Sequence, residues 1–410
     1  MEIEAGFQDT EAGKIPLGWL VKPIAEIADV KSGKRLPLGK SLVNRETSHP
    51  YIRVADMYQG GVALKNIMYV PDAVFPLIKN YRIFIDDIFI SVAGTLGVVG
   101  KIPKELDGAN LTENADRLTT IKCNRDYLLY ILMSFLIQNK IEAEKTLGAQ
   151  PKLALIRIRK FQVPLPPTKA EQAAIATALN DADALITRLE KLIAKKRNMK
   201  QGALQELLKP KEGWAVKRLG DCLRQNPDYG INAAAVPFNE TLPVYLRITD
   251  ITEDGKFARE NVVSVRSSRS FKYYLEDGDL VFARTGASVG KTYLYNPKDG
   301  MLVFAGFLIR IKTVRETLSP VYFKYFTQTA NYWNWIGANS ARTGQPGING
   351  NEYRELPITV PPKIEEQNRI AQILSDMDAE VEALETKLAK YKMMKQGMMQ
   401  KLLTGKIRLV

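Results

Sequence analysis

The segment GASVGKT, which begins at Gly286, carries the glycines and the lysine that hold nucleotide phosphates in P-loops. A P-loop needs one residue more between its first glycine and its Gly-Lys pair, so that successive backbone N–H groups turn toward the phosphates. The residues that follow here, TYLY, are typical of a strand, whereas a P-loop opens a helix. The segment is therefore interpreted as a glycine-rich turn between two strands, with Arg284 and Lys291 at its ends.

Few residues suit nucleophilic or metal chemistry. The chain has one histidine, His49, and two cysteines, Cys123 and Cys222. Zinc sites and serine–histidine or cysteine–histidine catalysis depend on these residue types, and His49 lies in a polar run, ETSHP, typical of a surface loop. We therefore expect no catalytic, cofactor-binding or metal-binding residues in this chain.

The composition indicates the cellular compartment of the chain and the chemical class of its binding partner. The scarcity of cysteine suits the reducing cytoplasm, and the polar, acidic N-terminus is not typical of a signal peptide. The longest apolar run, residues 127–137, is too short to span a bilayer, so no membrane association is expected. The net charge of +13 over 410 residues favours a polyanionic partner, nucleic acid first.

The sequence contains an internal duplication. The stretch from Pro166 to Leu208 matches the stretch from Pro361 to Leu403 without a gap, at an offset of 195 positions. The regions before these stretches repeat more loosely: YIRVAD at Tyr51 matches YLRITD at Tyr245. Each half is therefore a divergent globular region followed by a near-invariant helical one.

The repeated stretches predict two long helices. Their apolar residues recur at alternating steps of three and four, which indicates the narrow seam of a coiled coil. Antiparallel pairing of the two helices with each other is expected, and two separate amphipathic helices packed on their own globules are the alternative. The expected seam residues are Ile175, Leu179, Ile186, Leu189, Ile193, Ile370, Leu374, Met377, Val381, Leu384, Leu388 and Tyr391.

The globular parts predict an α+β fold. Short β-rich runs bounded by Asp, Gly and Asn precede an expected helix around residues 126–140 and again around 318–335. Four parts are expected: a globular domain at 1–160, a helical region at 161–208, a second globular domain at 209–355 and a second helical region at 356–410.

This organisation suggests a ruler for double-stranded DNA. A helix of about 40 residues spans roughly 60 Å, so two basic globules on such a strut could each read a short sequence with an unread spacer between. Val92 stands where Arg284 stands in the other half, which predicts two different specificities. The candidate DNA-binding residues are Lys31, Lys34, Arg35, Arg53, Lys101, Gln150, Lys152, Arg247, Arg266, Arg269, Lys272, Arg284, Lys291, Arg342, Thr343 and Gln345.

The chain resembles the specificity subunits of Type I restriction–modification systems. The resemblance rests on PLPPTKAEQAAIA, VPPKIEEQNRIAQIL and MKQGMMQKLLTGK, with the openings GWLVKPIAEIADVKSGK and GWAVKRLGDCL, and covers nearly the whole chain. It implies two target recognition domains, each reading half of an asymmetric bipartite site, and two helical regions that pair as an antiparallel coiled coil.

The resemblance also implies partners. These are two methyltransferase subunits that carry S-adenosylmethionine and methylate adenine N6, and restriction or translocase subunits that use ATP and Mg²⁺. This subunit itself performs no chemistry in such systems. The nearest approach to a methyltransferase motif, Asn226-Pro-Asp-Tyr229, has aspartate where the second proline belongs.

Three alternatives remain at this point. A single-chain methyltransferase or nuclease needs a cofactor motif or a carboxylate–lysine cluster, and neither is found in the sequence. A scaffold that joins two protein-binding modules predicts little salt dependence of DNA affinity. A specificity subunit of another restriction class, or an orphan one, predicts the same fold.

Overall fold

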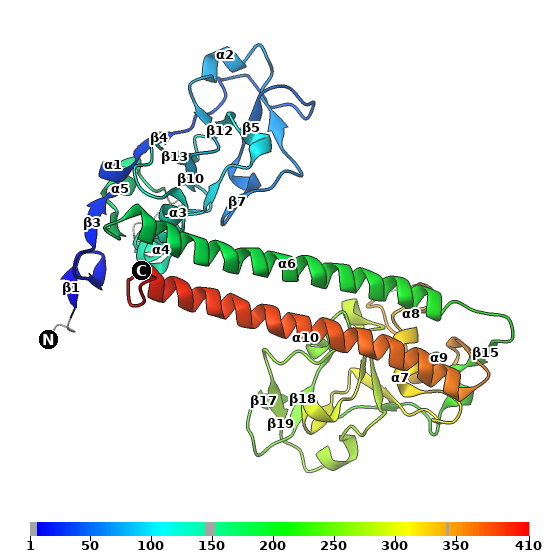
Figure 1. Ribbon diagram of the computed structural model, residues 1–410. Helices are drawn as coiled ribbons and strands as arrows, with labels where there is room; N and C mark the ends of the chain where they lie inside the picture. The colour runs from blue at the N-terminus through cyan, green and yellow to red at the C-terminus, as the bar shows by residue number, and fades with distance from the viewer. Residues whose placement is uncertain (1–5, 144–151, 342–343, 410) are drawn as a thin grey trace. The chain divides into compact units, whose positions relative to one another are not determined.

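The computed structural model describes residues 6–143, 152–341 and 344–409 (Figure 1). The chain divides into two compact units: Met1–Glu190 with Thr386–Val410, and Lys191–Glu385. Each unit contains a part of both long helices, α6 (Lys169–Leu207) and α10 (Ile364–Leu402).

The first unit contains two four-stranded sheets. One sheet has the order β11 (Val99–Lys101), β10 (Ile88–Ser91), β13 (Ala115–Thr119), β4 (Asp29–Ser32). The other has the order β8 (Met68–Tyr69), β5 (Pro50–Ile52), β12 (Ala109–Leu111), β9 (Arg82–Ile83). The β5–β12 pair is parallel, and the other pairs in both sheets are antiparallel.

Short elements complete this unit. Two-stranded pairs join β1 (Phe7–Thr10) to β2 (Gly13–Pro16), β3 (Leu20–Pro23) to β14 (Gln162–Leu165), and β6 (Met57–Tyr58) to β7 (Gly61–Val62). The helices are α1 (Ile24–Ile27), α2 (Phe75–Ile78), α3 (Arg125–Met133), α4 (Phe135–Ala143) and α5 (Leu155–Lys160).

The second unit repeats this plan. Its first sheet has the order β21 (Thr292–Leu294), β20 (Leu280–Ala283), β23 (Leu308–Ile311), β16 (Asp228–Tyr229). Its second sheet has the order β17 (Ala235–Pro237), β19 (Val263–Val265), β18 (Val244–Leu246), β22 (Leu302–Phe304), again with one parallel pair, β18–β22. Outside these sheets β15 (Ala215–Arg218) pairs with β24 (Pro357–Val360), and the helices are α7 (Pro320–Phe326), α8 (Ala330–Ser340) and α9 (Gly350–Arg354). The expected α+β fold with an internal repeat is therefore confirmed.

Strand periodicity determines which face of the first sheet is buried against helices. In the first unit, Val30, Ile88, Ile90 and Leu118 lie in one core cluster with residues of α3 and α6. Phe89, the neighbour of Ile88 and Ile90, instead lies in a separate cluster with residues of the second sheet. Successive side chains of a strand point to opposite faces, so this sheet separates a helix-facing core from a core shared by the two sheets.

The single helix expected around 126–140 is two helices, and so is the one around 318–335. Ser134 interrupts the first, where its hydroxyl donates to the Ile131 carbonyl at 2.6 Å. Thr329 interrupts the second: its hydroxyl donates to the Phe326 carbonyl and its oxygen accepts from the Tyr332 N–H. Short hydroxyl side chains compete for backbone hydrogen bonds in this way and end helices.

The long helices run antiparallel within each unit. In the first unit, ion pairs join Asp183 to Lys395 at 2.6 Å and Glu190 to Lys392 at 2.7 Å. In the second unit, Lys196 pairs with Glu380 at 2.6 Å and Lys200 with Asp378 at 2.5 Å. The residue number falls along α10 as it rises along α6, which is the signature of antiparallel helices.

All five expected seam residues of α6, and three of the seven of α10, are buried. Ile175, Leu179, Ile186, Leu189, Ile193, Ile370, Leu374 and Val381 are at most 8 % exposed. Met377, Leu384, Leu388 and Tyr391 are half-buried. Their regular interdigitation as a coiled coil stays a prediction, and so do the four domain boundaries.

Candidate nucleic-acid interface

The GASVGKT segment is a turn between two antiparallel strands, as interpreted from the sequence. It connects β20 to β21, whose residues Phe282 and Thr292 pair directly. Gly286 and Gly290 have φ values of +73° and +88°, a region that side chains other than glycine rarely adopt. Backbone conformation therefore explains these two glycines without a nucleotide.

The segment of residues 345–348 lies against this turn. The Gly286 N–H donates to the Pro346 carbonyl at 2.9 Å, and the Ile348 N–H donates to the Arg284 carbonyl at 2.9 Å. A Cβ atom at Gly286 would stand 2.8 Å from Nε2 of Gln345. The structure thus brings Arg284 and Gln345, two predicted site residues, to the same place.

Arg284 is held over an aromatic ring. Its guanidinium lies 4.9 Å from the ring centroid of Tyr229, a cation–π distance. The Tyr229 hydroxyl in turn accepts from the Gly350 N–H at 3.0 Å. Within the described residues, Nε of Arg284 is buried without a hydrogen-bond partner, and no carboxylate lies within ion-pair distance of this side chain. Arg284 is therefore a fixed arginine with unused donors.

The corresponding turn of the first unit is apolar. It connects β10 to β11, and Val92, in the place of Arg284, is only 8 % exposed. A β-bridge joins Ala93 to Lys152, and the Leu153 N–H donates to the Val92 carbonyl at 2.9 Å. Lys152 is exposed. The same two segments meet in both units, but their side chains differ.

The lysines that follow the two turns both have acidic partners. Lys101 lies 3.3 Å from Asp126. Lys291 lies 2.6 Å from Glu253, and its own side chain is only 19 % exposed. Any contact of these lysines with a phosphate has to compete with a carboxylate.

Arg53 and Arg247 each bind the aspartate three positions later through two side-chain hydrogen bonds, an arrangement we call a fork. Arg53 donates from Nε and Nη2 to Asp56 at 2.9 and 2.7 Å, and Arg247 does the same to Asp250. Both aspartates are buried, and each hydrogen-bonded pair raises the pKa of its arginine. These forks fix the short helical turns after β5 and β18. A DNA contact of either arginine stays a prediction.

The remaining candidates lie near strand ends. Arg35 pairs with Glu113 at 2.7 Å, and Lys34 lies 5.6 Å from the Tyr81 ring. Lys31 is exposed on β4, at the edge of its sheet. Arg266, Arg269 and Lys272 are exposed after β19. Gln150, Arg342 and Thr343 lie outside the described residues.

Sequence reasoning did not identify a polar clamp that occurs once in each unit. In the first unit the Tyr130 hydroxyl donates to Asp183 at 2.8 Å, and Lys395 pairs with Asp183 and lies over the Tyr130 ring. In the second unit Tyr325, Asp378 and Lys200 repeat these contacts, with a hydroxyl-to-carboxylate distance of 2.7 Å.

All three clamp residues recur at the offset of 195 positions, so the repeat itself was the available signal. Burial is the largest cause that raises the pKa of both tyrosines, and the hydrogen bond to the aspartate adds to it, while Ser375 opposes it at Tyr325; both hydroxyls therefore stay protonated donors. The clamp joins α3 or α7, each from the globular part of its unit, to both long helices.

The glutamine of each EQ pair makes a second repeated joint. Gln172 accepts from the Asn124 N–H at 2.8 Å, and Gln367 accepts from the Ser319 N–H at 3.0 Å. Asn124 and Ser319 are the residues just before α3 and α7. The glutamine of the repeated PPxxxEQ pattern thus joins each long helix to the start of α3 or α7.

The two halves of the chain match the same family model. A sequence model described as the Type I restriction modification DNA specificity domain matches residues 16–201 and again residues 202–391. The chain belongs to this family. The resemblance stated from the motifs is thereby confirmed, and DNA binding is a property of the family.

Full-length relatives agree with this assignment. The chain is 24% identical to a putative type I restriction enzyme MjaX specificity subunit of Methanocaldococcus jannaschii, over 99% of this chain and 97% of the relative. It is 23% identical to the EcoKI specificity subunit of Escherichia coli K12, over 97% and 90%. The specificity-subunit likeness therefore extends over both units.

Solved structures show the same fold. The S subunit of a Type I restriction–modification system from M. genitalium aligns with a TM-score of 0.60 at 15% identity, covering 98% of each chain. A second chain, from a structure of complex assembly in the type I R-M system, aligns with a TM-score of 0.54 at 16% identity, over 96% of this chain and 99% of the other. Within the described residues of this specificity subunit, no helix is both long and apolar enough to cross a membrane.

Proposed function

We propose that this specificity subunit reads an asymmetric, bipartite DNA site, one half-site with each recognition domain. It directs two methyltransferase subunits, which carry S-adenosylmethionine and modify adenine N6, and ATP- and Mg²⁺-dependent restriction subunits to that site. The chain itself is non-catalytic and acts in the cytoplasm.

One observation carries this proposal: the two units build the same strand–turn–strand frame and present different side chains from it. The β20–β21 turn places Arg284 beside Gln345, whereas in the β10–β11 turn Val92 is buried and the adjoining segment exposes Lys152. Two copies of one frame with different side chains suit two different half-sites better than one repeated half-site.

Arg284 is the strongest candidate for reading a base. Arginine makes a bidentate contact to the O6 and N7 atoms of guanine in the major groove. Stacking on Tyr229 at 4.9 Å restricts the orientation of the guanidinium before DNA arrives, which lowers the entropic cost of the contact. The adjacent glycines allow the backbone to approach the DNA closely.

The motif that most resembled a methyltransferase signature has other roles. In Asn226-Pro-Asp-Tyr229, the Asp228 carboxylate accepts two hydrogen bonds from Arg310, at 3.1 and 2.6 Å. Tyr229 lies under Arg284. These contacts support a structural use of this segment and a non-catalytic subunit.

The experiment is a genome-wide map of N6-methyladenine in the source cell, with and without this gene. Loss of one asymmetric split motif is the expected result, and it would identify both half-sites. An unchanged map, together with duplex binding that does not weaken as salt rises, would refute the proposal and favour a protein scaffold.

A further inference from the structure

One pair of facing residues differs in sign between the two units. In the second unit β16 pairs with β23, and Asp228 is the direct partner of Arg310. In the first unit the equivalent strands are β4 and β13, and Lys31 is the direct partner of Arg117. Directly opposed residues of an antiparallel pair lie on the same face at close range, so two like charges there destabilise the sheet.

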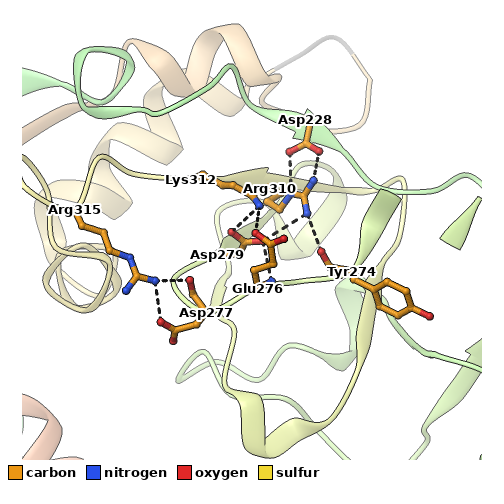
Figure 2. Close-up of polar contacts among 8 residues, drawn as sticks. All are labelled: Asp228, Tyr274, Glu276, Asp277, Asp279, Arg310, Lys312 and Arg315. Atoms are coloured by element: carbon orange, nitrogen blue, oxygen red, sulfur yellow. Dashed lines mark hydrogen bonds and ion pairs between the residues drawn. The ribbon is translucent and has the colours of Figure 1, made fainter. Parts of the chain in front are cut away.

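The second unit neutralises its arginine internally (Figure 2). Arg310 is bonded by Asp228 at 2.6 Å, approaches Asp279 at 3.5 Å and donates to the Tyr274 carbonyl at 2.9 Å. Lys312, next but one on the chain, pairs with Glu276 at 2.7 Å. Three carboxylates thus surround two cations, and each cation has a carboxylate partner. We call this cluster closed.

The equivalent arginine of the first unit, Arg117, has hydrogen-bond donors without partners. Nε and Nη1 of Arg117 are buried with no hydrogen-bond partner in the described residues, and Nη2 donates to the Asn80 carbonyl only weakly, at 3.3 Å. Burial lowers the pKa of the Arg117 guanidinium, Asp87 opposes that effect, and the positive charge of Arg82 adds to it. Two further cations, Lys31 and Arg82, therefore lie close to an arginine with two unused donors.

Asp87, which stands in the place of Asp279, is buried and opposes the effect of burial on the pKa of Arg117, but within the described residues it forms no ion pair with these cations. Across residues 6–143, 152–341 and 344–409, the ion pairs within 4.0 Å include none of Lys31, Arg82 and Arg117. Arg82 instead lies 5.2 Å from the Phe84 ring, which is partly exposed. Where the second unit has Asp228 and Glu276, the first has Lys31 and Phe84.

We propose that Lys31, Arg82 and Arg117 form a phosphate site that takes a backbone phosphate of the DNA bound by the first recognition domain. This inference rests on the proposed DNA-reading function. It adds one phosphate contact to the first recognition domain, whereas in the second domain the equivalent arginine is already paired with carboxylates. A phosphodiester supplies negative charge beside the facing cations and an acceptor oxygen for Nη2 of Arg117, whose present bond to the Asn80 carbonyl is long at 3.3 Å. Such a contact positions the domain on the duplex without reading sequence.

The test is to close the site as the second unit does, with Lys31→Asp in the full-length chain. Aspartate at 31 would face Arg117 as Asp228 faces Arg310. The plot of log affinity for a duplex against log salt concentration is expected to lose about one unit of slope for each phosphate contact removed. The urea midpoint is expected to stay or rise, because Arg117 gains a partner.

Lys104→Asp is the matched control. It makes the same charge change in the same unit, at an exposed residue that begins the short helical turn Lys104–Leu106. If both variants shift the salt slope equally, net charge explains the effect and the phosphate site is refuted. If the wild-type chain shows no salt-dependent duplex binding, the proposed function fails first.

Inorganic phosphate separates the two sources of the ligand. Phosphate added at constant ionic strength is expected to compete with duplex for the wild-type chain and not for Lys31→Asp. If phosphate raises the urea midpoint of the wild type alone while both chains keep the same DNA salt slope, the site binds a free anion, and the assignment to the DNA backbone is wrong.

Discussion

The closed cluster of the second unit makes a quantitative prediction for Asp228→Asn. Arg310 is 8% exposed and loses its two hydrogen bonds to a carboxylate, whereas Asp279, at 3.5 Å, remains as a partial partner. Removing one partner of a buried ion pair costs about 3–5 kcal/mol. The Asp228 side chain is 36% exposed, so water replaces part of the interaction, and a loss of about 2 kcal/mol in the free energy of unfolding is expected.

Urea unfolding followed by tryptophan emission suits this variant. Three of the four tryptophans, Trp214, Trp333 and Trp335, lie in the second unit, so the signal reports mainly on that unit. The measured quantity is the shift in urea midpoint at unchanged slope, which converts to free energy. Two units need not unfold together, so the slope has to be compared before the conversion.

Asp277→Asn is the control, in a separate ion pair beside this cluster (Figure 2). Asp277 pairs with Arg315 at 2.8 Å, but both side chains are more than half exposed, at 70% and 57%. An exposed pair of this kind contributes less than about 1 kcal/mol. Equal midpoints for Asp228→Asn and Asp277→Asn would refute the reasoning that burial makes the first pair important.

Three further predictions concern the interface, the clamp and the cysteines. Arg284→Met should weaken binding to the cognate duplex by about 1–3 kcal/mol if the arginine reads a base, while binding to random duplex changes little; equal loss on both duplexes would contradict base reading. Tyr325→Phe should lower the free energy of unfolding by about 1–2 kcal/mol, since the hydroxyl donates to the Asp378 carboxylate at 2.7 Å; an unchanged urea midpoint would contradict this. Burial raises the pKa of Cys123 to about 11, so the folded chain binds the thiol proton more tightly than the unfolded chain. Stability should therefore fall as pH rises from about 9 toward 11, measured by urea midpoint, and the thiol should react with a disulfide reagent at pH 8 far more slowly in the folded than in the unfolded chain.

The sequence was informative wherever a pattern reflects one physical period. The alternating steps of three and four within 166–208 and 361–403 predicted two long helices because a helix repeats its buried face every three to four residues. The structure has these helices at Lys169–Leu207 and Ile364–Leu402. The offset of 195 positions predicted a duplicated fold, since similar sequences fold alike. The spacing of Gly286 and Gly290 excluded a P-loop without any structure.

The sequence was less informative about charged side chains on loops. Arg53 and Arg284 are both arginines beside strands, yet Arg53 is bound by its own Asp56 and Arg284 stacks on Tyr229. Which of them keeps donors for a ligand depends on the residues that reach it, and these come from distant parts of the chain. The helix breaks at Ser134 and Thr329 were also missed, because a hydroxyl residue is tolerated inside many helices.

By itself, the sequence determined the family, the duplication, the two long helices and the divergence of the two halves, because each of these is a pattern that survives without coordinates. Only the tertiary structure decided which charges face each other. Lys31 and Arg117 are 86 positions apart, and Asp228 and Arg310 are 82 apart, yet strand pairing places each couple directly opposite. Electrostatic energy depends on that separation in space, steeply at short range. One unit therefore has a neutralised arginine and the other an open one, in two copies of the same sheet.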